Sequence, residues 1–167
     1  MGGTYSVALA INNAGQVVGA STTTSDIDVH ATLWNGSTAI DLGTLGGSFS
    51  YAYAINNSGQ IVGVSTTIGN TFFHATLWTG DTLIDLNSLL DVGTINAGWQ
   101  LADAHGINDN GWIVGNAYNN LTGQAHAFLL SPGVAAPVPE PATYTMMLAG
   151  LCLLSFSARR RKQLAAA

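Results

Sequence analysis

The first 158 residues of this 167-residue chain contain neither lysine nor arginine. The basic residues stand together near the C-terminus, as Arg159, Arg160, Arg161 and Lys162. Because proteins bind nucleic acid with cations that displace the counterions of the phosphates, this absence excludes a nucleic-acid-binding body. It also removes the side chains that most often clamp an anionic substrate.

Acidic residues are few and unevenly placed. Eight Asp and no Glu precede Val138, and the only Glu is Glu140. The body therefore carries a formal charge of −8 and the C-terminal segment +3, which together give the net charge of −5. Polar character comes instead from Ser, Thr, Asn, Gln and Gly, which suits an exposed, neutral, hydrogen-bonding surface.

Cysteine is nearly absent. The single Cys152 excludes an internal disulfide. The body must therefore be held together by apolar burial and β ladders.

The body is a repeat. A turn motif occurs three times, with spacings of 44 and 52 residues, as INNAGQVVG from Ile11, INNSGQIVG from Ile55 and INDNGWIVG from Ile107. A second block keeps the same spacing, as HATLW from His30, HATLW from His74 and HAFLL from His126. The eight additional residues of the longer spacing lie around 87–100.

Each unit reads as four short strands, which in the second copy fall at 51–55, 60–65, 74–78 and 82–86. Asn and Ser at the first turn hydrogen-bond their own backbone, and Gly supplies the positive φ that closes a hairpin. The sequence therefore predicts an all-β fold of tandem four-stranded antiparallel meanders, an incomplete β-propeller-like array. A β-solenoid or an open array of hairpins is the alternative. No helical period appears in the body.

The recurring blocks, together with LGTLGG at 42–47, resemble the HAF family of extracellular repeats. The resemblance covers about residues 1–131, and it implies surface location without implying an activity. Thr32 and Thr76 stand where the family name has Phe, and the third unit lacks the LGTLGG block. We expect three repeats within 1–133, at about 1–44, 45–88 and 89–131.

The C-terminal segment has three parts: a Pro-rich linker at 134–141, an uncharged apolar run at 142–158 and a basic tail at 159–167. As a helix, the 17-residue run spans about 26 Å, near the minimum for a membrane core of about 30 Å. The basic cluster is expected to act as a cytoplasmic stop-transfer signal. The sequence therefore predicts one transmembrane helix at 142–158.

This order of parts resembles the PEP-CTERM sorting signal, with its motif at Val138, Pro139, Glu140 and Pro141. The resemblance implies recognition and cleavage by an exosortase, a transpeptidase-like enzyme, at or near Pro-Glu-Pro. An ordinary tail anchor is the alternative. Either way the body faces outward, first at the inner membrane during sorting and then at the cell surface or in the secreted extracellular matrix.

The first residues show no basic segment followed by an apolar run, so we expect no signal peptide within the given sequence. Met1-Gly2-Gly3 aligns with Leu45-Gly46-Gly47, so the chain starts inside a repeat block. We expect a truncated chain or a misplaced start, with an upstream strand and a signal peptide in the full protein.

Several residues are candidates for a binding site. His30, His74 and His126 hold equivalent places, which favours structural hydrogen bonding over a metal site. Trp34 and Trp78 end matching strands and are expected to pack between repeats. The region unique to the third unit offers the candidate ligand-binding residues Trp99, Asp103, His105, Asp109 and Trp112.

An oxygen-rich patch lies at 103–110, but it lacks the ordered ligand series of a calcium loop, so turn chemistry is favoured over a weak calcium site. No G-x-S-x-G elbow and no Glu-based carboxylate pair is present. No cofactor and no catalytic residue is predicted. We expect a non-enzymatic surface or matrix protein with a structural or weak glycan-binding role towards extracellular polysaccharide. An extracellular propeller enzyme acting on glycans is the alternative.

Overall fold

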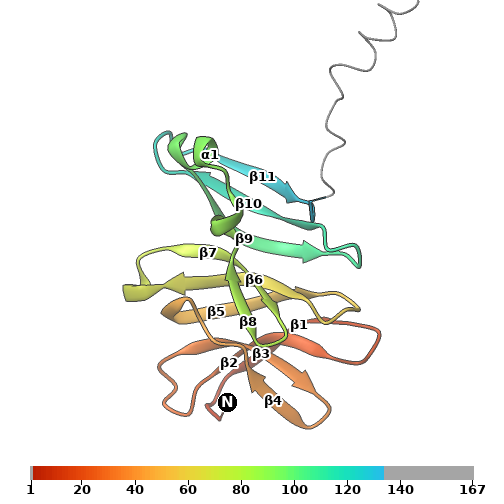
Figure 1. Ribbon diagram of the computed structural model, residues 1–167. Helices are drawn as coiled ribbons and strands as arrows, with labels where there is room; N and C mark the ends of the chain where they lie inside the picture. The colour runs from red at the N-terminus through yellow and green to blue at the C-terminus, as the bar shows by residue number, and fades with distance from the viewer. Residues whose placement is uncertain (1, 134–167) are drawn as a thin grey trace, which may run out of the picture. The chain divides into compact units, whose positions relative to one another are not determined.

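A computed structural model describes residues 2–133, which form three successive antiparallel β-sheets (Figure 1). The first sheet contains β1 (Ser6–Ile11), β2 (Val17–Thr22), β3 (Val29–Asn35) and β4 (Thr38–Asp41). The second sheet contains β5 (Gly46–Ile55), β6 (Ile61–Thr67), β7 (Phe73–Thr79) and β8 (Thr82–Asp85). The third sheet contains β9 (Trp99–Ile107), β10 (Ile113–Asn119) and β11 (Ala125–Leu130).

Within each sheet, every strand pairs with the next along the chain. A single parallel pair, Val29 with Phe49, links the first sheet to the second. The prediction of an all-β body made of antiparallel meanders is confirmed. Within residues 2–133 the sheets do not close into a barrel or a propeller.

Within residues 2–133, helical structure is confined to short turns. These are η1 (Ile68–Asn70), η2 (Leu86–Leu89) and α1 (Val92–Asn96). The last two occupy the additional residues of the longer repeat spacing. The side chain of Asp91 caps α1 by accepting a hydrogen bond from the backbone N–H of Thr94 (3.0 Å).

The three predicted hairpin turns follow the first strand of each sheet. In the second sheet, the Asn56 side-chain oxygen accepts hydrogen bonds from the backbone N–H groups of Ser58 (3.1 Å) and Gln60 (2.9 Å). Gly59 closes this turn at φ +79° and donates its N–H to the Asn56 carbonyl. The turns at Asn12 and Asn108 repeat these contacts, so the turn prediction is confirmed.

The sheets pack face to face around two apolar cores. Val18 and Ala31 of the first sheet are fully buried against the second sheet. The second sheet contributes Ala52, Ile55, Ile61 and Trp78 to this core. The core between the second and third sheets contains Val62, Ala75, Leu86, Leu101, Ala104, Ile113 and Ala117. Each sheet therefore buries apolar side chains against its neighbour in the chain, as repeat proteins do.

In each sheet one position must be glycine, because the backbone of the preceding strand lies too close to leave room for a side chain. A Cβ atom added at Gly19, Gly63 or Gly115 would lie 1.9, 1.8 or 2.0 Å from a carbonyl oxygen of the preceding strand. Each of these glycines lies beside a shift in the strand register, where the two backbones come together. The recurrence of Val-Gly in the repeat thus has a steric cause.

The repeat pattern predicts that residues 7–11 pack in the core as residues 51–55 do, and this prediction is wrong for one face of β1. Ile11 is 66% exposed, whereas the equivalent Ile55 is 8% exposed. The reason is position in the stack: the second sheet covers one face of the first, and no described residue lies against Ile11 on the other.

The predicted linker at 134–141, transmembrane helix at 142–158 and basic tail at 159–167 lie outside the described residues. Among the residues that are described, no helix has the length and apolar character needed to cross a membrane.

Candidate functional site

The five ligand-binding candidates of the third unit do not form one site. Asp103 and His105 lie together on β9, whereas Asp109 lies in the following turn. Trp112 precedes β10 and is 45% exposed. Trp99 begins β9 and packs beside the second core. The predicted oxygen-rich patch is therefore divided between a strand and a turn.

Asp103 and His105 belong to a group of polar and aromatic side chains where β9 lies beside β5 of the second sheet. This group, called the edge cluster below, contains Tyr51, Tyr53, Asp103, His105 and Asn116. The imidazole of His105 stacks on the ring of Tyr53, with 4.9 Å between centroids and 17° between planes. Tyr53 in turn lies 6.3 Å from Tyr51.

A carboxylate organises the polar side of the edge cluster. The Oδ1 atom of Asp103 lies 2.8 Å from His105 Nε2 and 2.8 Å from Asn116 Nδ2, which donates to it. The side chain of His105 is 53% exposed and that of Asp103 is 28% exposed. An aromatic ring, a carboxylate and an amide are thus presented together at the surface.

The electrostatics of this cluster follow from its packing. Partial burial, and secondly the negative charge of Asp103, raise the pKa of the Tyr53 hydroxyl above its usual value. Tyr53 therefore stays protonated near neutral pH, and its hydroxyl is available as a hydrogen-bond donor.

Asp109 has a structural role. Its carboxylate accepts hydrogen bonds from the backbone N–H of Asn57 (2.8 Å) and from the Asn57 side-chain amide (2.8 Å). These bonds hold the pKa of the Asp109 carboxyl below its usual value. Asn13 donates its backbone N–H to the Asn57 side chain in the same way (3.0 Å), so Asp109 belongs to a contact repeated between turns.

The equivalent histidines differ in their partners. Nδ1 of His30 lies 2.8 Å from Asp41, and Nδ1 of His74 lies 2.6 Å from Asp85. Burial of Asp85 acts to raise the pKa of its carboxyl, but hydrogen bonds from His74 and Asn87 outweigh this effect, and the pKa is lowered.

Within residues 2–133 no strand follows β11, so no equivalent of Asp41 or Asp85 lies opposite His126 there. His126 packs instead on Trp99, with 4.8 Å between ring centroids. Within residues 2–133, no three His, Cys, Asp or Glu side chains lie close enough together to hold a metal ion.

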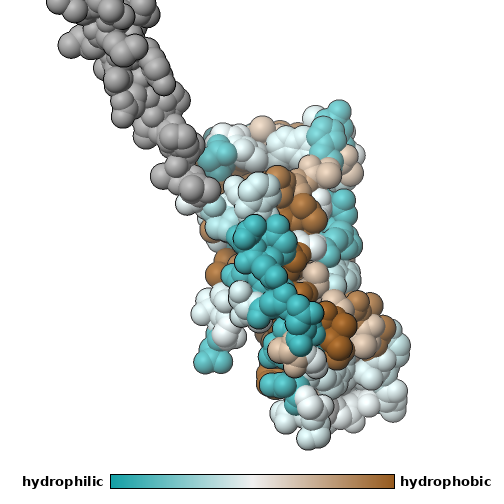
Figure 2. Space-filling model, turned by 90° about the vertical axis from the view of Figure 1, so that its right-hand side faces the viewer, coloured by the Kyte–Doolittle hydropathy of each residue, from teal (hydrophilic) through white to brown (hydrophobic). Residues whose placement is uncertain are grey.

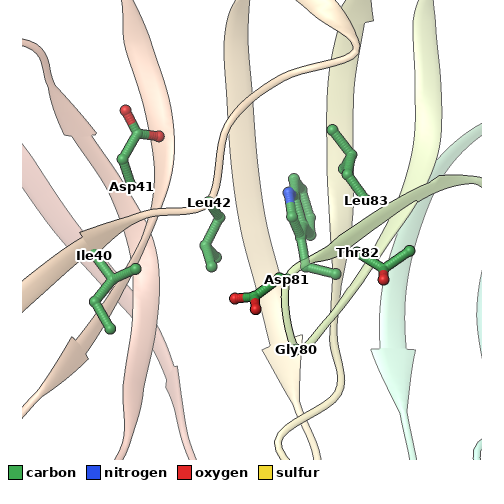
Figure 3. A pocket seen from close by; sticks show the side chains of 8 residues that line it. Ile40, Asp41, Leu42, Gly80, Asp81, Thr82 and Leu83 are labelled. Carbon is green, nitrogen blue, oxygen red and sulfur yellow. The ribbon is translucent and has the colours of Figure 1, made fainter.

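A pocket of about 230 Å³ opens where β4 and β8 lie near each other (Figure 3). Its lining residues are Ile40, Asp41, Leu42, Trp78, Gly80, Asp81, Thr82 and Leu83. Trp78 is 2% exposed, and its Nε1 donor is buried without a hydrogen-bond partner among the described residues. The predicted packing between repeats is confirmed for Trp78, but Trp34 is only partly buried and belongs to neither apolar core. The indole N–H of Trp78 adds one unused donor beside the pocket.

Sequence reasoning missed Tyr51, Tyr53 and Asn116. The signal was present in the repeat spacing, because Tyr53 lies 52 residues before His105 and Tyr51 lies 52 residues before Asp103. Equivalent residues of stacked repeats lie near each other, so the contact of Tyr53 with His105 follows once the repeats are known to stack.

The sorting residues Val138, Pro139, Glu140 and Pro141, and the basic cluster from Arg159 to Lys162, lie outside the described residues. In the comparison with protein families, residues 137–162 match the PEP-CTERM protein-sorting motif. No curated protein and no solved structure matches the chain. The motif implies an exported protein that is sorted by an exosortase and reaches the cell surface or the extracellular space.

Proposed function

We propose that this exported chain is a non-enzymatic surface or matrix protein, and that its HAF-type β-repeat body binds neutral extracellular polysaccharide weakly. The observation that carries the exported location is the sorting motif at 137–162. In this proposal the exosortase acts while the 142–158 segment is held in the inner membrane, cleaves near Pro139-Glu140-Pro141, and leaves the body outside.

The edge cluster supports the glycan-binding part of the proposal. A pyranose ring has an apolar face that packs on an aromatic ring, and the exposed imidazole of His105 offers one, backed by Tyr53. Hydroxyl groups of the sugar need donors and acceptors close by, and Asp103 and Asn116 supply both. The cluster is open rather than enclosed by a deep pocket, which suits weak binding.

Charge supports a neutral ligand. The described residues contain no Lys and no Arg, so an acidic polysaccharide would meet only carboxylates and no compensating cation. A neutral chain avoids this repulsion.

The state of the carboxyl groups supports a non-enzymatic role. A general acid that works near neutral pH needs a raised pKa. Each Asp with a clearly shifted pKa is shifted downward instead: Asp26, Asp85, Asp91 and Asp109. Asp103 is engaged by His105 and Asn116. The alternative, a propeller enzyme acting on glycans, is therefore less well supported.

Affinity electrophoresis through gels that contain soluble neutral polysaccharides tests the binding. We expect the wild-type chain to be retarded and the variants Tyr53→Ala and His105→Ala to lose most of the retardation. Phe72→Ala is the matched control, because it removes an aromatic residue that is 51% exposed, comparable with the His105 side chain, and that lies outside the edge cluster. Equal retardation of all variants would place binding elsewhere, and hydrolysis of the polysaccharide would favour the enzyme.

A further inference from the structure

Within residues 2–133 the first and third sheets lie at the two ends of the stack, and the burial of the third sheet differs most clearly from that of the second. In β6 of the second sheet, every residue from Ile61 to Thr66 is buried, so both faces of the strand are covered. In β10 of the third sheet, buried and exposed residues alternate strictly from Ile113 to Asn119. One face of the third sheet is therefore open.

The N-terminal face of the stack presents residues that the second sheet buries. Ile11, Val17 and Trp34 lie opposite one another across β1, β2 and β3. The equivalent residues of the second sheet, Ile55, Ile61 and Trp78, are 8%, 3% and 2% exposed and pack against the first sheet. By contrast, Ile11 is 66% exposed, and Val17 and Trp34 are partly exposed.

The C-terminal face presents the complementary set. In the second sheet, Val62 and Ala75 are fully buried against the third sheet. Their equivalents, Val114 and Ala127, are exposed, and Leu129 beside them is 56% exposed. The N-terminal and C-terminal faces therefore match the two surfaces that pack together at each of the two interfaces between sheets within the chain.

The hydrogen bonds between successive turns also leave one unused donor and one unused acceptor at opposite ends of the stack. The side-chain amide of Asn12 donates to the carbonyl of Asn56 (3.1 Å), and that of Asn56 donates to the carbonyl of Asn108 (3.1 Å). Within residues 2–133 the Asn108 amide makes no such bond, and the Asn12 carbonyl accepts none from another turn. A donor therefore remains at the C-terminal end and an acceptor at the N-terminal end.

These turns lie one above another on the right of Figure 1. From that side, Figure 2 shows a hydrophilic stripe across the stack, with hydrophobic surface beside it. The arrangement places polar turn contacts and apolar sheet contacts side by side, so that both can extend in the same direction.

We propose that the C-terminal face of one copy of this chain (Val114, Ala127 and Leu129) docks on the N-terminal face of a second copy (Ile11, Val17 and Trp34). The contact uses the geometry of the two internal interfaces, with Asn108 donating to the Asn12 carbonyl of the next copy. Such a head-to-tail interface closes into a ring or continues as a filament.

The composition of the two faces favours docking of a second copy of this chain. The C-terminal face also carries Asn116, which stands where the second sheet has Val64 and lies opposite Asp103 of β9. Its amide already donates to Asp103, so docking does not leave this donor unpaired. No cation lies among the described residues, so burial of the two faces desolvates no Lys or Arg.

Cysteine crosslinking of the full-length chain tests the geometry. Asn13 meets Asn57, and Asn57 meets Asp109, at the two internal interfaces. In a Cys152→Ser background, we expect Asn13→Cys mixed with Asp109→Cys to form a crosslinked dimer under mild oxidation, whereas neither variant alone does. A chain that carries Asn13→Cys and Asn57→Cys calibrates the reaction, because its two thiols meet within one copy.

A second measurement removes the apolar contact. Ile11→Asp places a charge on the N-terminal face, and we expect it to weaken self-association in sedimentation equilibrium by about tenfold or more. Ile68→Asp is the matched control, since Ile68 is 81% exposed and lies in η1 of the second sheet. Every variant keeps the same C-terminal segment, so any association through that segment is common to all.

The crosslinking and sedimentation results distinguish head-to-tail stacking from the other possible contacts. A mixed Asn13–Asp109 crosslink together with a selective effect of Ile11→Asp supports head-to-tail stacking. Crosslinks of either variant with itself would indicate a symmetric contact and overturn the proposal. Absence of the mixed crosslink while the calibrating chain reacts would show that the two faces do not meet, and would also overturn it.

Discussion

Replacement of Asn56 by Ala measures what the contact between turns contributes to stability. Asn56 is 3% exposed, and its side chain makes four hydrogen bonds. Two are within the turn, from the backbone N–H groups of Ser58 and Gln60. The other two use its amide, which donates to the Gln60 side chain (2.8 Å) and to the Asn108 carbonyl in the next sheet (3.1 Å).

The expected loss follows from these contacts. At roughly 1 kcal/mol net for each hydrogen bond, with some groups left buried and unpaired, Asn56→Ala should destabilise the fold by about 3–4 kcal/mol. For a body of this size, that corresponds to a fall in Tm of about 10–15 °C.

Asn108→Ala is the matched comparison. The exposed Asn108 side chain keeps only the bonds within its turn, from the N–H groups of Asn110 and Trp112 (3.0 Å each). Its loss should cost about 1–2 kcal/mol. Thermal unfolding followed by far-UV circular dichroism compares the two variants. Equal falls in Tm would refute the reasoning, because they would show that the amide contacts of Asn56 add nothing to the turn itself.

Three further predictions concern sterics, packing and pH. Gly63→Ala should prevent the close pairing of β5 and β6 and abolish cooperative unfolding. At Gly80 an added Cβ would meet no atom within 4 Å, so Gly80→Ala should lower the free energy of unfolding by only about 1–2 kcal/mol, because of its positive φ. Trp78→Ala should cost about 3–5 kcal/mol in urea unfolding and Trp34→Ala clearly less, because only Trp78 is fully buried. Because the folded-state pKa of Asp109 is lowered, its contribution is present above its unfolded pKa of 3.8 and is lost as pH falls through the lower folded value. Urea midpoints measured between pH 6 and 2 should therefore fall less steeply in Asp109→Asn, and identical slopes would contradict this assignment.

Local features of this fold could be predicted from the sequence because local chemistry determines them. The side chain at Asn56 and the positive φ at Gly59 specify the hairpin without help from the rest of the chain. Strand alternation then sets the limits of β6 and β7 to within a few residues.

Contacts between repeats could not be predicted with the same ease, because they depend on how the sheets stack. Turn chemistry explained why Asn56 and Asp109 are present, but their bonds to neighbouring turns appear only once the turns are aligned. For the same reason the oxygen-rich patch at 103–110 is continuous in sequence but not in the structure. In the structure Asp103 faces His105 and Asn116 on the strands, while Asp109 faces Asn57 in another turn.

The repeats differ in residue type at the edge of the stack, and burial explains why. Residues between the sheets are constrained by packing on both sides, so Val18 and Val62 are identical in type and fully buried. The equivalent positions Leu9, Tyr53 and His105 lie at the edge formed by the first strands, where side chains remain partly open to solvent. Substitution there costs little stability, which leaves these positions free to change in size and polarity. A recognition function on this scaffold is therefore better sought along that edge than in the apolar layers between the sheets.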